Sequence, residues 1–315
     1  MRNVFGIKFY ALTAALFISF NSLYGAVCTD TCHVESFCDD DCENFWASAD
    51  VLFWRACEDG FECSFGTTKI STGVSDGRIV SDIREKDKDI DFDWDAGFRI
   101  GAGYTFDCSC WEGAIYWTHF NENGNSHDCN NHAKWKLTFN QIDTVLGYEF
   151  NYNSCFNFRP FFGARYAQIN QRLSTHLETI ITAEATESTS TAITIKKDRE
   201  HFWGAGPLFG LEGNYFLGCS FSIYGNLAGS FLYGNFKNNF FDSDLFTTAI
   251  NNCHSTKNHC GVLTGFDAGL GVRYEICSVT LQLGLEHHTY FDFNQIGCGG
   301  DLNLYGINAS AVVRF

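Results

Sequence analysis

The sequence predicts an all-β chain, folded as a transmembrane up-and-down antiparallel β-barrel of about ten strands. The first observation is residues 92–106 (FDWDAGFRIGAGYTF), in which every even position is apolar and every odd position is charged, glycine or threonine. A period of two is the signature of a strand whose faces meet different surroundings. In a membrane barrel the apolar face meets lipid and the polar face lines the interior. A soluble β-sandwich, in which the apolar face packs on a second sheet, is the alternative.

The second observation is that short and long connections alternate along the chain. Tight turns are expected near positions 108, 153, 218 and 277, and long loops near 75, 128, 186, 247 and 296. Bacterial outer-membrane barrels have short periplasmic turns and long extracellular loops. The strands that these connections separate are 45–54, 92–106, 111–120, 135–150, 156–171, 202–216, 221–233, 264–276, 279–291 and 302–315.

Composition agrees with this fold class. Aromatic residues make up 17% of the chain, and 30 glycines stand against 2 prolines, a mixture that favours twisted strands over helices. After the N-terminal segment no run of apolar residues is long enough for a transmembrane helix. The net charge of −16 argues against nucleic acid as a partner, because phosphate binding needs basic patches.

The N-terminal residues predict export. Residues 1–26 read as a signal peptide, since Arg2 and Lys8 precede a short apolar core and Gly25-Ala26 ends it with small residues. Residues 27–44 then form a cysteine-rich periplasmic extension, in which disulfides are favoured over a zinc site because the spacing lacks the usual C-x2-C knuckle. The barrel is expected to occupy 45–315.

Three details of the barrel remain open at this stage. Residues 121–134, 175–197 and 234–260 read as polar loops, whereas 55–91 could supply two more strands and raise the count to twelve. Alternation slips near Gln141, and a β-bulge would absorb that slip. The last strand ends in Phe315, the ending expected of the element that barrel insertion machinery recognises.

Several segments resemble the Legionella-type major outer membrane protein family, which has relatives in environmental chlamydiae. The matching stretches include 49–60 (ADVLFWRACEDG), 92–106, 111–120 (WEGAIYWTHF), 159–171 (RPFFGARYAQINQ), 202–218 (FWGAGPLFGLEGNYFLG), 225–236 (GNLAGSFLYGNF) and 285–295 (LEHHTYFDFNQ). The resemblance covers nearly all of 45–315. It implies a multi-pass pore-forming protein of the outer membrane of a Gram-negative-type bacterium, and it supplies no catalytic residue.

Counting in twos along each strand assigns the charged side chains of the lumen. The expected pore-lining residues are Asp95, Arg99, Glu112, Arg159, Arg165, Glu212, Arg273, Glu275, Glu286 and Arg314, and Asp50, Asp93, Asp267 and His288 share their parity. Charges facing lipid are costly, so these groups must meet water or each other. They either line an open pore and set its selectivity or fill a narrow barrel as ion pairs, because barrels of about eight strands hold only side chains.

Fifteen cysteines in an exported chain predict disulfides. The candidates are Cys28, Cys32, Cys38, Cys42, Cys57, Cys63, Cys108, Cys110, Cys155, Cys219, Cys253, Cys260 and Cys277. Those in or beside the short turns could bond to other envelope proteins or to the extension. Local pairs are favoured for Cys57–Cys63 and Cys253–Cys260. The connectivity does not follow from the sequence.

The expected function is that of a porin for passive diffusion of small hydrophilic solutes or ions. The alternative is a disulfide-cross-linked structural envelope protein or adhesin with a filled barrel. No enzyme is expected, since the carboxylates are scattered over separate strands and His287 and His288 point to opposite faces. We expect no cofactor and no bound metal. The expected partners are outer-membrane lipid and insertion machinery, and a homo-oligomer is left open.

Overall fold

The computed structural model describes residues 45–58, 67–75, 78–86, 92–106, 110–127, 132–183, 188–218, 220–246, 249–293 and 299–315. The predicted signal peptide and cysteine-rich extension lie outside these residues. Among the residues described, no helix is long and apolar enough to cross a membrane.

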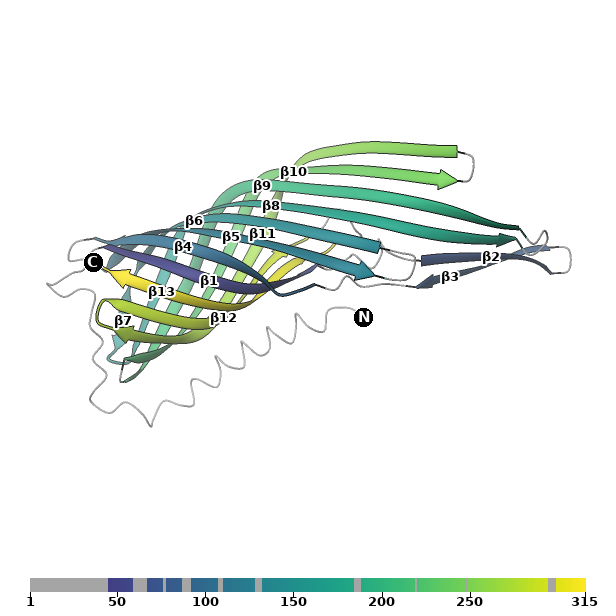
Figure 1. Cartoon of the computed structure of the whole chain (residues 1–315). Helices are drawn as coiled ribbons and strands as arrows, with labels where there is room; N and C mark the ends of the chain where they lie inside the picture. The colour runs from purple at the N-terminus through teal and green to yellow at the C-terminus, as the bar shows by residue number, and fades with distance from the viewer. Residues whose placement is uncertain are drawn as a thin grey trace.

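Ten strands form one closed antiparallel cylinder (Figure 1). They are β1 (Phe45–Glu58), β4 (Asp95–Thr105), β5 (Trp111–His127), β6 (His132–Tyr148), β8 (Phe156–Ala183), β9 (Ser188–Gly218), β10 (Phe221–Phe246), β11 (Ala249–Ile276), β12 (Val279–Phe291) and β13 (Leu302–Arg314). Each strand pairs with the next in the chain, β1 pairs with β13, and β8 pairs with both β6 and β9. The predicted up-and-down barrel of ten strands is confirmed.

The first long connection contains a hairpin that lies outside the cylinder. Strands β2 (Thr67–Ser75) and β3 (Arg78–Lys86) pair with each other. Strand β2 meets the barrel only where Ser71 and Thr72 pair in parallel with Thr182 and Ala183 of β8. The twelve-strand alternative is therefore wrong. The short strand β7 (Phe150–Asn153) pairs with the beginning of β8.

The two rims of the barrel differ. One rim, here called the inner rim, carries the short turns and both ends of the barrel chain; the other is the outer rim. At the outer rim β8, β9, β10 and β11 continue well beyond the cylinder (Figure 1), with lengths of 28, 31, 26 and 28 residues. Most of 121–134, 175–197 and 234–260, expected to be loops, is therefore strand. These stretches are polar because they stand outside the membrane, where a strand's outward face meets water.

Strand β6 shows how the polarity of a strand reverses at the membrane boundary. Its inward face is apolar from Ala133 to Phe139 and polar at Gln141 and Asp143, while its outward face changes from exposed lysines to Ile142. The pairing of β6 with β5 and β8 runs through this point without a shift. The predicted bulge at Gln141 is wrong. The apparent slip is an exchange of surroundings, from water outside and apolar core inside to lipid outside and polar lumen inside.

Large apolar side chains cover the outside of the cylinder between the rims. Val51, Phe53, Phe98 and Ile115, for example, are 38–65% exposed. A contiguous apolar surface of this kind is unfavourable in water and is the lipid-facing band of a membrane barrel. The buried apolar cluster lies inside the cylinder, toward the outer rim, and includes Leu52, Trp54, Phe120, Phe139 and Tyr290.

Candidate functional site

The lumen contains a polar cavity of about 250 Å³. Nine of the ten predicted pore-lining residues lie on its wall: Arg99, Glu112, Arg159, Arg165, Glu212, Arg273, Glu275, Glu286 and Arg314. Asp95 does not. It sits farther outward on β4, where its carboxylate accepts a hydrogen bond from the backbone N–H of Asn123 at 3.3 Å. Asp50, Asp267 and His288 also line the cavity, whereas Asp93 is exposed outside it.

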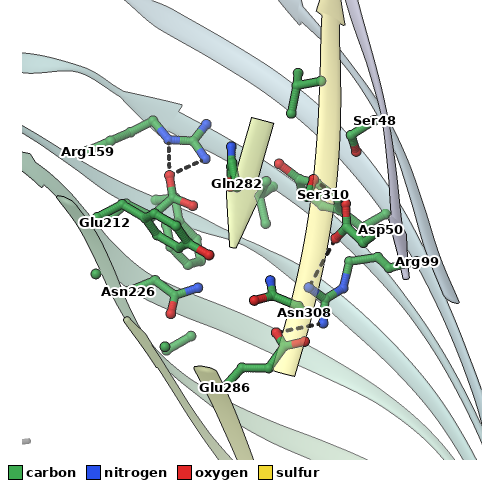
Figure 2. A pocket seen from close by; sticks show the side chains of 18 of the residues that line it. Ser48, Asp50, Arg99, Arg159, Glu212, Asn226, Gln282, Glu286, Asn308 and Ser310 are labelled. Atoms are coloured by element: carbon green, nitrogen blue, oxygen red, sulfur yellow. Dashed lines mark hydrogen bonds and ion pairs between the residues drawn. The ribbon is translucent and has the colours of Figure 1, made fainter. Parts of the chain in front are cut away.

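Arg99 holds the first of three ion clusters in the cavity. Its guanidinium lies 3.4 Å from Asp50 on β1 and 3.1 Å from Glu286 on β12, and its Nε donates to the Thr118 hydroxyl. Figure 2 shows Arg99 between the two carboxylates, with Ser310 donating to Asp50 from the other side. Alternation along three separate strands brings these groups to one point.

Arg165 holds the second cluster. Its guanidinium lies 2.8 Å from Asp143 on β6 and 2.6 Å from Asp267 on β11. Asp267 also lies 2.7 Å from Nδ1 of His288, whose Nε2 is 3.6 Å from Glu286. The imidazole thus links the second cluster to the first, forming one network across the barrel interior.

Arg159 holds the third cluster, nearer the inner rim. It forms ion pairs with Glu112 on β5 and with Glu212 on β9, the latter at 2.6 Å. Figure 2 shows the Arg159–Glu212 pair on the wall opposite Arg99. Charged groups on facing walls therefore line one cavity.

The cavity wall is acidic on balance. Eight carboxylates line it, against five guanidinium groups and the imidazole of His288. In a low-dielectric surround this imbalance attracts cations and repels anions.

An aromatic layer lies between the polar cavity and the outer rim. We call Trp54, Phe120, Phe139 and Tyr290 the aromatic seal; each is at most 1% exposed. The Trp54 ring packs 5.4 Å from Phe120 and 6.5 Å from Phe139, and Phe139 lies 5.9 Å from Tyr290. Above the seal, Phe202, Phe236 and Phe293 are also buried and in contact.

The seal is tied to the charged network beneath it. The indole N–H of Trp54 donates to Glu286 at 3.0 Å, the Arg99 guanidinium lies 5.8 Å from the Trp54 ring, and the Tyr290 hydroxyl donates to Gln141. The polar edges of the seal are thereby satisfied, as buried Trp and Tyr require. Polar cavity and apolar seal form one continuous packed unit.

Sequence reasoning missed several cavity residues, above all Asp143, Gln141 and Glu149. The supposed slip at Gln141 interrupted the alternation along β6, so the carboxylate of Asp143 was not assigned to the inward face. Continuing the alternation without a bulge would have placed Asp143 inside. The asparagines of the wall, such as Asn226 and Asn308, carry no charge to mark them.

The six cysteines that the structure describes occupy different surroundings. Cys155 is buried and Cys253, Cys260 and Cys277 are exposed, all four with free thiols; Cys57 and Cys110 are the others. Cys253 and Cys260 both lie on β11, opposite Asp242 and Asn235 of β10. Seven extended residues span about 23 Å, far beyond disulfide reach. The predicted Cys253–Cys260 pair is therefore wrong. Seven other candidates lie outside the described residues, namely Cys28, Cys32, Cys38, Cys42, Cys63, Cys108 and Cys219, so the Cys57–Cys63 pair stays a prediction.

The described residues contain no group of three or more His, Cys, Asp and Glu side chains placed to hold a metal ion. His288 faces Asp267 and Glu286, so its ring meets two acids and not a nucleophile. The arrangement can bind and orient water or a small cation. His287 points outward, where it lies 6.3 Å from the Tyr305 ring.

Known proteins similar to this chain include one family and several solved structures. A family model described as the Legionella pneumophila major outer membrane protein precursor matches residues 40–304. No curated protein matches. Among solved structures the chain is similar to the Neisserial surface protein NspA, with 14% identity, a TM-score of 0.32, and coverage of 86% of this chain and 97% of that one. It is also similar to the Ail protein of Yersinia pestis (9% identity, TM-score 0.29, 86% and 99% coverage). A third similar structure is the translocator domain of the autotransporter NalP from Neisseria meningitidis (12% identity, TM-score 0.32, 97% and 98% coverage).

Proposed function

We infer that this chain, an outer-membrane β-barrel that belongs to the Legionella pneumophila major outer membrane protein family, serves as a closed structural barrel of the envelope that anchors a surface-exposed β-sheet. The observation that carries this inference is the aromatic seal. General porins need a hydrated path from rim to rim, and Trp54, Phe120, Phe139 and Tyr290 leave no exposed surface for one.

The width of the barrel supports the same inference. Ten strands stand close to the eight that side chains fill and far from the sixteen or so of open porins. Arginine–carboxylate clusters from facing strands occupy the interior. The strands that continue past the outer rim give the protein a sheet outside the membrane for contact with the surroundings.

Exposed thiols supply a means of linking this barrel to other envelope proteins. Cys277 lies exposed in the turn between β11 and β12 at the inner rim, where disulfides form in an oxidising compartment. Cells producing Cys277→Ser should show fewer high-mass species on non-reducing gels of isolated envelopes. Cys155→Ser, which removes a buried thiol of the same rim, is the matched control. Equal cross-linking in both variants would rule out a link through Cys277.

Single-channel recording in planar bilayers tests the closed barrel. The wild-type chain should give no discrete current steps, whereas Trp54→Ala with Phe139→Ala should conduct. The control is Phe53→Ala, which removes a lipid-facing ring from the position next to Trp54. Regular steps from the wild-type protein would refute the proposal.

The second candidate is a porin that passes small cations or other small hydrophilic solutes. The excess of carboxylates on the cavity wall favours it, because rings of acidic side chains select cations. On this alternative the wild type conducts with cation preference, and Arg165→Glu strengthens that preference.

A further inference from the structure

Above the lipid-facing band, one side of the barrel carries a cluster of cations. Its six members, here called the outer basic patch, are Lys134, Lys136, Arg172, Lys197, Arg199 and Lys237, and all are exposed. They come from β6, β8, β9 and β10 and point outward from the barrel. The chain as a whole carries a net charge of −16, so this concentration of positive charge is local.

Strand register brings the cations side by side. Lys136 pairs with Arg172, and Arg172 pairs with Arg199, so three cations lie in one row across three strands. Neighbouring strands are about 4.8 Å apart, which puts the three within about 10 Å. Like charges directly opposite each other destabilise a sheet. Such a row is favourable only where an anion lies over it.

No carboxylate among the described side chains supplies that anion. Within the described part of the chain, none of the six cations makes an ion pair. The outward face of β5, β6, β8, β9, β10 and β11 beyond the level of Trp203 carries no Asp or Glu among the side chains described. The carboxylates of these strands, such as Asp198 and Asp242, face the other way, where Asp242 meets Lys196 at 4.0 Å.

The height of the patch matches a lipid headgroup layer. Trp203, half exposed, pairs with Asn235, and Lys237 follows Asn235 by two residues. Two residues advance about 7 Å along a strand, or about 5 Å along the membrane normal at the usual tilt. Exposed Trp and Tyr mark the edge of the hydrocarbon, and long Lys and Arg side chains can reach down toward it.

We propose that the outer basic patch binds the phosphate groups of the anionic glycolipid of the outer leaflet. Arg172 and Arg199 would each meet a phosphate with paired N–H groups, the geometry that guanidinium offers to phosphate. Lys136 and Lys237 would add point charges at its margin. Outward-facing Asn170 and Asn239 lie in the same rows and can bond to sugar hydroxyls. One side of the barrel would thus hold a fixed layer of lipid, while the opposite side would not.

The test uses the full chain refolded in detergent, with lipid A carrying both phosphates as the probe and native mass spectrometry as the readout. The triple variant Lys136→Gln, Arg172→Gln, Arg199→Gln should bind on the order of 100-fold more weakly, since each cation near an anionic surface contributes about fivefold. The matched control is Lys196→Gln with Lys257→Gln, which removes two exposed cations from the inward side of β9 and β11. It should bind as the wild type does.

Two further measurements keep the proposal open to refutation. Dephosphorylated lipid A should bind the wild-type chain as weakly as intact lipid A binds the triple variant, and this comparison needs no mutation. Equal binding of both lipids would overturn a phosphate site. Inorganic pyrophosphate or a sulfated sugar that bound as tightly as lipid A would instead assign the patch to a soluble polyanion and overturn a lipid site. Heat-modifiable migration on gels checks that the triple variant is folded.

Discussion

Replacing Arg99 with alanine should destabilise the barrel more than any surface change. Arg99 is the cation shared by Asp50 and Glu286, at 3.4 and 3.1 Å. Without it Asp50 and Glu286, whose side chains are 8–9% exposed, lie close together with no guanidinium between them, and only Glu286 keeps a neighbouring base, His288 at 3.6 Å. Removing one partner of a buried ion pair costs about 3–5 kcal/mol, mostly as the penalty of the charge left behind.

The cavity beneath the aromatic seal determines where the loss of stability falls between about 3 and 5 kcal/mol. Its volume of about 250 Å³ is enough to admit water to the stranded carboxylates, and hydration lowers their penalty. Ser310 and Trp54 continue to donate to Asp50 and Glu286. We therefore expect a loss of about 3 kcal/mol in the free energy of unfolding, the lower end of the range.

Urea unfolding in lipid vesicles, followed by heat-modifiable migration, measures this loss. Lys196→Ala is the control, because its bridge to Asp242 spans 4.0 Å with both side chains more than 40% exposed, and such pairs contribute about 0–1 kcal/mol. A triple variant, Arg99→Met with Asp50→Asn and Glu286→Gln, should recover most of the stability, since it leaves no unpaired charge. A loss below about 1 kcal/mol in Arg99→Ala would refute the reasoning.

Two other predictions concern the sheet itself. Gly206→Val should abolish folding of the barrel, because a Cβ at Gly206 would collide with the backbone carbonyl of Phe231. Gly229→Ala should fold, because the nearest neighbour of its Cβ is a ring atom of Phe209 at 3.4 Å. The yield of heat-modifiable protein distinguishes the two variants. Burial raises the pKa of Asp198, on the sheet outside the membrane, to about 6. The sheet should lose stability as pH rises from about 4 to 6, where the unfolded carboxyl ionises and the folded one does not, and change little from this group above that. Hydrogen exchange of β9 and β10 should show this slope, and Asp198→Asn should remove it.

Alternation along single strands was enough to predict the strand count and most of the charged side chains on the cavity wall. Residues 92–106 placed Arg99 inside, and the same counting placed Glu286 and Arg165 there. This prediction succeeded for a physical reason. A closed barrel has only two faces, and a charged side chain on the lipid-facing one is costly near the midplane of the membrane, so the charges must point inward.

Register and strand length could not be predicted in the same way. Arg99 and Glu286 are 187 residues apart, and their meeting depends on the stagger of strands around the whole cylinder. The outer parts of β8 to β11 read as loops because their sequences are polar, and polarity alone does not distinguish a loop from a strand with water on one side. The reversal of inward and outward polarity at Gln141 was misinterpreted for the same reason, because the residue pattern of one strand does not show where the membrane ends.

That boundary also explains why the lumen is closed where it is. Within the membrane, burying an apolar side chain inside the barrel gains little, because lipid outside is equally apolar. Beyond the membrane the outside is water, and full burial of a Trp or Phe contributes about 1.5–3 kcal/mol or more. Trp54, Phe120, Phe139 and Tyr290 all lie at or beyond this change, and each is fully buried. Opening the seal would return that surface to water at a cost comparable to the stability of a typical domain, about 5–15 kcal/mol. In the proposed closed barrel, any route for solutes through the lumen would therefore require a partner or a force that offsets this cost.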